Sequence, residues 1–521
     1  MNSVNKNALA WLIANRSILL LGVILAIATV FRTFKLGEVP YGLNQDEVSI
    51  AYDAYAIGYF GIDRAGNSLP LFLESWGNGM QALSSYLLVP LYYVFGVSVL
   101  TFRSVGACFG VLSVLLVYKL CSEIFTRSQG LISAFLVAIS PWHVMQSRWF
   151  FEATSFPFFF LVALTVFVIA AKRKSFFGLR AASVLFGACL YTYGPAHLVV
   201  PIFFFLACLR LLTNKTFHHR QIILAIVLFC VCALPLAYYF LINSFAFPQI
   251  DSVVSIPKLS SEPRYESLIG PLPLADVGNR LLQLFTIFLN QRDDLPYNAM
   301  PIFGIMYPFA WAAFCSGIAV IAASLWKKEG NFAELILIAI IPIVVMAALI
   351  DVNLNRMNVG VLIFLIVSTI GVGFFMRLHR VLSIIVVCVY AMLSLQFAAN
   401  YFGDYQQKIG PHFFSSFTEA MERLDKGVPG NVCITDTVKM PYIYALFFYR
   451  VNPHDFANTV AYVQPGEEFQ RVKSFDRFTF GLTNCDVEKT HVFLLRKWEI
   501  SGIPLKSLVI QDFGDFIAAY R

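Results

Sequence analysis

Charged side chains are scarce in this sequence, and their scarcity excludes most ordinary classes of protein. Asp, Glu, Lys and Arg make up 13% of the 521 residues, whereas a soluble domain has about 25%. Hydrophobic residues make up 58%, and the mean hydropathy is +0.70. A chain with so few charges does not cover its own surface in water, and disordered or nucleic-acid-binding chains carry far more charge. The composition therefore predicts a polytopic membrane protein.

The sequence also lacks the short motifs of several enzyme classes. It has no phosphate-binding loop ending in Gly-Lys-Ser/Thr, no GxGxxG after a strand, no paired Cys/His spacing for zinc and no GxSxG elbow. Acids and bases in the middle of apolar runs, which ion-coupled transporters need, are nearly absent. Any chemistry must therefore come from the ends of the apolar segments and from the loops.

Cysteine shows no metal-ligand spacing, although ten cysteines are present. Eight of them lie in apolar runs, where cysteine acts as a small hydrophobic residue. Cys433 and Cys485 lie in a more polar C-terminal tail. If that tail is extracytoplasmic the two thiols can form a disulfide, and otherwise they stay free.

Long apolar runs predict helices that cross the membrane, because about twenty residues span the hydrocarbon core. The eleven predicted spans are Ser17–Phe34, Arg103–Cys121, Gly130–Pro141, Ser155–Ala171, Leu179–Pro195, Leu198–Leu211, Ile222–Ile242, Phe303–Trp326, Phe332–Ile350, Val359–Met376 and Leu382–Ala398. Another apolar run, Leu83–Leu100, is interrupted by Pro90 and Gly96. If it does not cross, as an interfacial or re-entrant segment, every basic loop faces inward, as the positive-inside rule requires. We therefore expect a cytoplasmic-membrane protein with its N-terminus in the cytoplasm and its tail outside.

The expected architecture is an all-α polytopic membrane domain, residues 1–399, followed by a small extracytoplasmic α/β domain, residues 400–521. The membrane domain has two large outer loops, residues 35–102 and 243–302. The predicted elements of the tail are Asn431–Thr435, His491–Leu495 and Ser507–Ile510 as strands and Pro441–Tyr449 as a helix.

Polar residues gather on the predicted outer side. Asp46 and Glu47 follow the first span, and adjacent carboxylates just above hydrocarbon are either fully hydrated or functional. Without a function, Asp46 is the N-cap of a solvated helix. Arg148 and Glu152, in the next outer turn, are four residues apart and form a structural ion pair if they share a helix.

Further polar residues lie at the same predicted level. Arg356 can pair with Asp351 or bind a phosphate. Three residues are candidates for a substrate pocket or, alternatively, for an interfacial belt: His143, Tyr193 and His197. Carboxylates and arginines thus converge on one face, which indicates work on a lipid-linked anionic substrate instead of passage through a pore.

The pattern resembles the GT-C superfamily of integral-membrane glycosyltransferases, in the bacterial branch related to protein O-mannosyltransferases and the lipid A aminoarabinose transferase. The features that carry the resemblance are Asp46–Glu47 after span one, Leu91–Ser98 leading to Arg103, Ser140–His143 with Arg148 and Glu152, and Asn355–Arg356. The likeness covers about residues 17–400 and is weaker in the tail. Glu74–Gly77 departs from the Lys-Pro-Pro-like stretch of the aminoarabinose branch, which argues against a lipid A acceptor.

The resemblance implies a polyprenyl-phosphate sugar donor, transfer with inversion, and a lipid, glycan or protein acceptor at the outer face, with no nucleic-acid partner. It implies Asp46 as general base, Glu47 and Glu152 as further catalytic carboxylates, and Arg148 or Arg356 as the cation that binds the donor phosphate. Some relatives use a divalent cation and others do not, so the need for a metal stays open, and no other cofactor is expected.

The chemistry of this reaction agrees with these residue types. A sugar hydroxyl is a poor nucleophile unless a carboxylate accepts its proton. The phosphate leaves as an anion that arginine stabilises through paired hydrogen bonds. Two alternatives keep the same residues without a reaction: a glycolipid flippase or transporter, and a lipid-sensing scaffold whose tail binds a partner.

Overall fold

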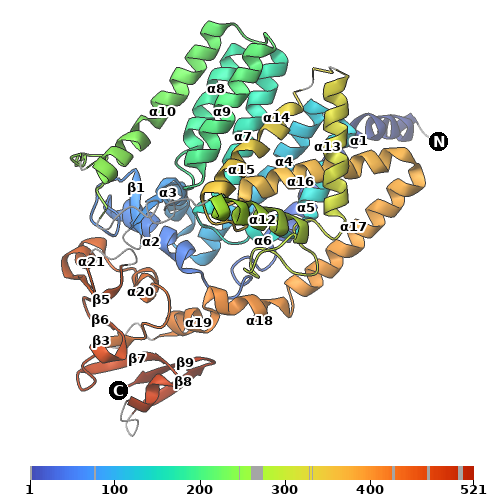
Figure 1. The fold of residues 1–521 in the computed structure, drawn as a ribbon. Helices are drawn as coiled ribbons and strands as arrows, with labels where there is room; N and C mark the ends of the chain where they lie inside the picture. Colours follow the sequence, from blue (N-terminus) through green and yellow to red (C-terminus); the bar gives the residue numbers. More distant parts are fainter. Residues whose placement is uncertain are drawn as a thin grey trace.

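The computed structural model consists of a helical bundle with a β-containing tail at one end (Figure 1). The structure describes residues 3–75, 78–245, 247–259, 274–327, 329–330, 332–424, 429–465, 470–502 and 508–521. Ser507, in a predicted strand, and Trp76 and Gly77, in the stretch that departs from the aminoarabinose branch, lie outside the described residues.

The apolar runs of the sequence form the helices of the bundle. These are α1 (Ser3–Thr33), α4 (Val99–Ile124), α5 (Arg127–Ile139), α7 (Glu152–Arg173), α8 (Phe176–Cys189), α9 (Ala196–Thr213), α10 (His219–Phe245), α13 (Ala310–Trp326), α14 (Glu334–Ile338), α15 (Ile340–Leu349), α16 (Asn358–Leu378) and α17 (Arg380–Tyr401). Seven of the described helices are long and apolar enough to cross a membrane. The protein is therefore a multi-pass membrane protein. The other predicted spans form shorter apolar helices, and the total of eleven stays a prediction.

Helix α16 is the centre of the bundle, and its side chains are buried on all faces from Asn358 to Gly373. It packs most closely on α13, where two glycines allow the backbones to meet. A Cβ on Gly371 would lie 1.9 Å from the carbonyl oxygen of Ala313, and one on Gly317 would lie 2.0 Å from that of Val367. Small residues are the usual means of close helix packing in membranes.

The first outer loop folds into α2 (Gln45–Phe60), the hairpin β1 (Phe72–Ser75) and β2 (Asn78–Gln81), and α3 (Leu83–Phe95). At 13 residues, α3 is shorter than the roughly twenty residues that a span needs. Its last residues, Tyr93, Val94 and Phe95, are exposed. The non-spanning position of Leu83–Leu100, interfacial or re-entrant, stays a prediction, because α5, which forms a predicted span, is also 13 residues long.

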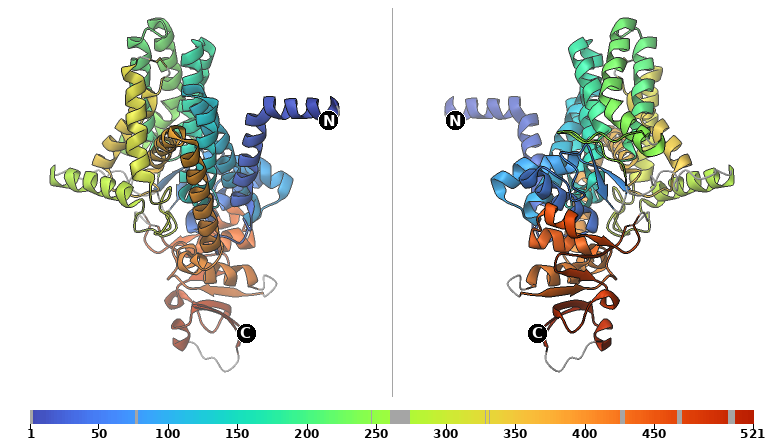
Figure 2. Two further views of the ribbon diagram at one scale, coloured as in Figure 1. Left: turned by 90° about the vertical axis from the view of Figure 1, so that its right-hand side faces the viewer. Right: turned by 90° about the vertical axis from the view of Figure 1, so that its left-hand side faces the viewer.

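The second outer loop contains α12 (Leu274–Asn290), which projects sideways from the bundle in both views of Figure 2. One side of α12 contacts the bundle, while Leu282, Phe285 and Leu289 are exposed. An exposed apolar helix that lies across the bundle is typical of a helix in the membrane interface.

The tail begins with α18 (Tyr405–Ile409), η1 (Gly410–Phe413) and α19 (Ser415–Arg423) and ends in a seven-stranded sheet of order β4-β5-β6-β3-β7-β9-β8. The strands are β3 (Asn431–Ile434), β4 (Ala461–Tyr462), β5 (Val472–Phe475), β6 (Phe478–Phe480), β7 (Thr490–Arg496), β8 (Val509–Phe513) and β9 (Phe516–Tyr520), and the remaining helices are α20 (Pro441–Tyr449), α21 (Pro453–Thr459), η2 (Leu482–Asn484) and η3 (Glu499–Gly502). Strand β3 is parallel to β6 and β7, and the other pairs are antiparallel. The predicted α/β tail is confirmed, and Cys433 and Cys485 form a disulfide.

The tail is not separate from the first outer loop, because the two share one hydrophobic core. Val48 and Tyr52 of α2 lie in this core with Phe417 of α19 and Tyr444 and Leu446 of α20. Domain boundaries at residues 399 and 400 stay a prediction, and the shared core shows that the tail rests directly on α2.

Candidate active site

Asp46 and Glu47 lie in the first turn of α2, and Asn44 caps this helix. The side-chain oxygen of Asn44 accepts the N–H of Asp46 at 3.0 Å, and the Glu47 carboxylate accepts the N–H of Asn44 at 3.0 Å. This reciprocal pair is a capping box. The N-cap is therefore Asn44, and the alternative that assigned this role to Asp46 is wrong.

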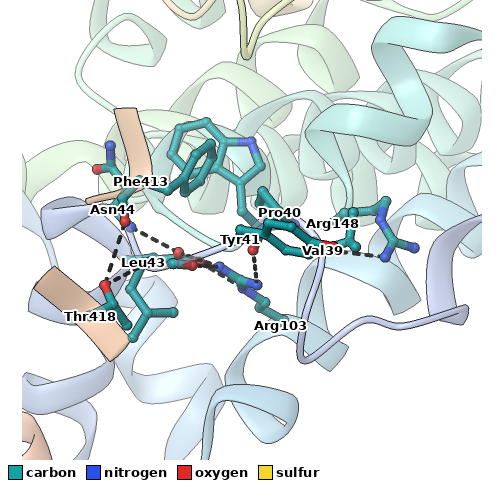
Figure 3. Close-up of polar contacts among 12 residues, drawn as sticks. Val39, Pro40, Tyr41, Leu43, Asn44, Arg103, Arg148, Phe413 and Thr418 are labelled. Atoms are coloured by element: carbon teal, nitrogen blue, oxygen red, sulfur yellow. Dashed lines mark hydrogen bonds and ion pairs between the residues drawn. The ribbon is translucent and has the colours of Figure 1, made fainter. Parts of the chain in front are cut away.

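Glu47 forms a fully buried ion pair with Arg103 of α4. The guanidinium donates to the two carboxylate oxygens at 2.8 and 3.2 Å, and neither side chain is exposed. Arg103 also donates to the carbonyls of Pro40 at 3.0 Å and Gly42 at 2.6 Å (Figure 3). Because buried charges need partners, the Glu47 carboxylate stays paired with Arg103 and stabilises the turn that precedes α2. This contact favours a positioning role for Glu47 instead of direct contact with substrate.

Asp46 is partly exposed and lies near the ring of Tyr297. Tyr297, which follows α12, packs edge-on against Trp149 at 5.7 Å and Phe413 at 5.8 Å between ring centroids. Burial, with the nearby carboxylates of Asp46 and Asp293, raises the pKa of Tyr297 to about 12. Three distant parts of the chain thus pack together near Asp46, with Trp149 and Phe413 buried and Tyr297 partly exposed. Sequence reasoning missed Tyr297, because only the fold brings it near α2.

Glu152 is the first residue of α7 and lies where the β1–β2 hairpin meets the bundle. Its carboxylate is 3.5 Å from the N–H of Gln81, whose side-chain amide lies 3.2 Å from the ring of His197. Two of the predicted site residues, Glu152 and His197, are therefore brought together through Gln81. Tyr193, near His197 in sequence, is half-buried and packs against the cores of the bundle and of the outer loop.

Arg148 supports the end of α1. Its guanidinium donates to the carbonyls of Phe31 at 2.9 Å, Phe34 at 2.6 Å, Lys35 at 3.2 Å and Val39 at 3.0 Å, and it is buried. A cation at the carbonyl end of a helix stabilises that end. Because its guanidinium already donates to four backbone carbonyls, Arg148 is a poor candidate for the cation that binds the donor phosphate. The predicted helical pairing with Glu152 is also wrong, because α7 begins only at Glu152.

His143, on α6 (Pro141–Gln146), is buried inside the protein. Its Nδ1 lies 2.7 Å from a guanidinium nitrogen of Arg32. Burial and this cation hold the pKa of His143 well below its usual value, so the ring is a neutral acceptor. This contact favours a structural role for His143, and its place in a substrate pocket stays a prediction.

Arg356 pairs with Asp351, and a second arginine shares the same carboxylate. Arg356 and Arg280 of α12 each lie 3.7 Å from Asp351, which is 68% exposed. Arg280 also donates to the carbonyl of Leu349 at 2.8 Å. Two cations around one anion leave a net positive charge, which favours a phosphate. Sequence reasoning missed Arg280, although a cation on an amphipathic interfacial helix is a recognisable signal.

An apolar groove of about 430 Å³ lies under α12. Its lining residues are Leu281, Leu284, Phe285, Phe288, Trp311, Phe314, Ile340, Ile343, Val344, Gly360, Ile363 and Phe364. Arg280 precedes the first of these on α12, and Arg356 precedes α16, which supplies the last. The positive cluster thus lies next to the groove in sequence, on α12 and in the turn that leads into α16.

No metal site is evident where the structure describes the chain: no group of three His, Cys, Asp or Glu side chains is placed to hold an ion.

Comparison with known proteins agrees with this architecture. The family model described as dolichyl-phosphate-mannose-protein mannosyltransferase matches residues 82–239. The crystal structure of ArnT from Cupriavidus metallidurans in the apo state aligns with a TM-score of 0.57 at 12% identity over 98% of both chains. The same protein bound to undecaprenyl phosphate aligns with a TM-score of 0.56 at 12% identity, over 96% of this chain and 97% of that one.

A third solved structure, the Archaeoglobus fulgidus oligosaccharyltransferase in the apo form, aligns with a TM-score of 0.53 at 12% identity. The alignment covers 94% of this chain and 70% of the oligosaccharyltransferase chain. None of the curated protein sequences compared with the chain matches it. The solved structures are GT-C membrane glycosyltransferases. The chain has the GT-C fold, and the resemblance predicted from its sequence is confirmed.

Proposed function

We propose that this protein is a glycosyltransferase that takes a sugar from a polyprenyl-phosphate donor at the outer face of the cytoplasmic membrane. The observation that carries the proposal is a pair of arginines beside an apolar groove: Arg280 on α12 and Arg356 in the turn before α16. A polyprenyl-phosphate sugar has the matching parts, an anionic head and a long apolar tail. The ArnT structure that contains undecaprenyl phosphate has this fold and supports the proposal.

The groove contributes to affinity through the tail of the donor. Each buried methylene is worth about 0.8 kcal/mol, so a few isoprene units outweigh the polar contacts of the head. Arg280 and Arg356 then fix the height of the phosphate at the membrane surface. The sugar attached to that phosphate extends above the groove, toward the loops that carry Asp46.

Asp46 is the proposed general base. It accepts the proton of the acceptor hydroxyl while that oxygen forms a bond to the anomeric carbon and the bond to the phosphate breaks. The phosphate leaves as an anion next to Arg280 and Arg356, which removes the need for an acid. One displacement inverts the anomeric centre. Glu47 positions Asp46, and Glu152, with Gln81 and His197, is a candidate for contacts with the sugar or the acceptor.

This function requires the tail and the outer loops to face away from the cytoplasm, with the N-terminus inside. The disulfide between Cys433 and Cys485 supports this orientation, because disulfides persist in oxidising compartments. The acceptor is a lipid, glycan or protein that reaches the same face.

The test is a release assay on the purified protein in lipid nanodiscs. A labelled polyprenyl-phosphate sugar and an extract of envelope acceptors are supplied, and free polyprenyl phosphate is measured. We expect release by the parent protein and a loss of about 100-fold or more in Asp46→Asn, with unchanged thermal unfolding. Asp404→Asn, at an exposed residue of the tail, is the control. An intact donor after translocation would identify a flippase, and full activity in Asp46→Asn would remove Asp46 as the base.

A further inference from the structure

The turn at residues 40–44 is held by side chains of the tail. The N–H of Tyr41 donates to the side-chain oxygen of Gln406 at 3.2 Å, across 365 positions of sequence. The N–H of Leu43 donates to the hydroxyl of Thr418 at 3.1 Å, across 375 positions. Gln406 and Thr418 are both buried, so water does not replace these acceptors readily.

Two further hydrogen bonds join the same turn to the tail. The hydroxyl of Tyr444, on α20, donates to the carbonyl of Leu43 at 2.7 Å. The side-chain amide of Asn44 donates to the carbonyl of His412 at 3.3 Å. Leu43 is therefore bonded to the tail through both its N–H and its C=O.

Gly42 shows how closely the tail approaches this turn. Its φ of +81° is one that glycine adopts without strain. A Cβ at this position would lie 2.3 Å from the carbonyl oxygen of Phe413 and 2.5 Å from the Cα of Ser415. The two backbones are in direct contact here, so a side chain at position 42 would push the tail and the turn apart.

Arg103 holds the opposite side of the turn through the carbonyls of Pro40 and Gly42. Figure 3 shows Arg103 on one side of the turn and Thr418 on the other. The turn leads directly into α2, where the N–H of Asp46 bonds to Asn44. The position of Asp46 is thus set by a turn that lies between the bundle and the tail.

We infer that the tail holds the catalytic turn in place and that Thr418 is a positioning residue for Asp46. The inference rests on the proposed role of Asp46 as the base. Loss of the Thr418 hydroxyl leaves the N–H of Leu43 buried without its acceptor, which costs free energy that a shift of the turn relieves. Such a shift moves the first turn of α2, and a displacement of about 1 Å in a catalytic group lowers the rate about 100-fold.

The experiment compares three variants of the full-length protein in nanodiscs. Thr418→Val removes the hydroxyl and keeps the volume, whereas Thr418→Ser keeps the hydroxyl and removes the methyl group. Thr459→Val is the control at an exposed position of the tail, where the Thr459 hydroxyl accepts the N–H of Asp476 at 3.1 Å. For Thr418→Val we expect a kcat about 10- to 100-fold lower with the donor KM unchanged. Thr418→Ser and Thr459→Val keep the parental kcat.

The outcomes separate this inference from the proposed function. A parental kcat in Thr418→Val, with Asp46→Asn inactive, overturns the inference and leaves the proposed function intact. Equal losses in Thr418→Val and Thr459→Val also overturn it, since they mark a general weakening of the tail. A parental kcat in Asp46→Asn overturns the assignment of the base. If Thr418→Val does not fold, Tyr444→Phe decides in the same way, with a several-fold lower kcat expected and a parental kcat overturning the inference.

Discussion

Arg103 and Glu47 form a two-pronged ion pair in which neither side chain is exposed to solvent. The same guanidinium holds the carbonyls of Pro40 and Gly42. One arginine of the bundle thus organises the entry to α2 and the place of Asp46. A buried pair of this kind is weak evidence for net stability, but removal of one partner leaves an uncompensated charge.

Glu47→Gln is therefore expected to destabilise the protein by about 3 kcal/mol, because the Arg103 cation stays buried without its anion. The measurement is thermal unfolding of the purified protein in detergent. Glu38→Gln is the control, since Glu38 is 69% exposed and only 4.0 Å from Lys35. That exposed pair is worth at most about 1 kcal/mol. Equal stability of the two variants would contradict a structural role for the buried pair.

Local sequence signals predicted the elements that local interactions decide. The helix Pro441–Tyr449 was placed correctly because Pro starts helices well and an apolar run follows it. The capping box of Asn44 and Glu47 was present in the sequence as well, three residues apart. Sequence reasoning missed it because the adjacent carboxylates, Asp46 and Glu47, also fit a catalytic pair.

Contacts between distant segments could not be predicted in this way. Arg280 and Leu349 are 69 positions apart, and only the packing of α12 on α15 brings them together. Arg148 has the right spacing for a helical pair with Glu152, but the helix starts too late. Thr418 and Gln406 carry no sequence signal at all, because their partners are backbone groups of the first loop.

Stability should depend on pH through Asp63, which is buried in the first outer loop. Burial, with the nearby Asp53 carboxylate, raises the pKa of Asp63 to about 7. Between the ordinary value of 3.8 and about 7, the folded state keeps a proton that the unfolded state has lost. This contribution therefore stabilises the protein at the acid end and is lost as the pH rises through that window.

Asp63→Asn removes this titration, because the amide is neutral at every pH. The unfolding temperature of the variant relative to the parent is expected to rise from pH 4 to pH 7 and to level off above. Differential scanning fluorimetry of the variant and the parent between pH 4 and pH 8 measures this difference in unfolding temperature. Asp404→Asn, at an exposed aspartate, should show no such trend. A flat difference for Asp63→Asn would show that the carboxyl ionises at its usual pH.

The paired arginines should affect binding of the donor more than turnover. We expect Arg280→Ala and Arg356→Ala each to raise the donor KM about 10-fold, because each charged hydrogen bond to phosphate is worth about 1.5–3 kcal/mol. Arg292→Ala, an exposed arginine just beyond α12, is the control. An unchanged donor KM in both variants would place the phosphate elsewhere.

The groove under α12 should select for the length of the donor tail. Ile363→Trp fills part of its volume of about 430 Å³, so the apolar surface available to a long tail decreases. We expect the preference for a long polyprenyl donor over a two-isoprene analogue to fall about 10-fold, since the short tail never used this surface. Competition between the two labelled donors in one reaction measures the preference. Leu282→Trp adds the same bulk to an exposed position of α12 and should leave the preference unchanged. A parental preference in Ile363→Trp would mean that the tail of the donor lies outside the groove.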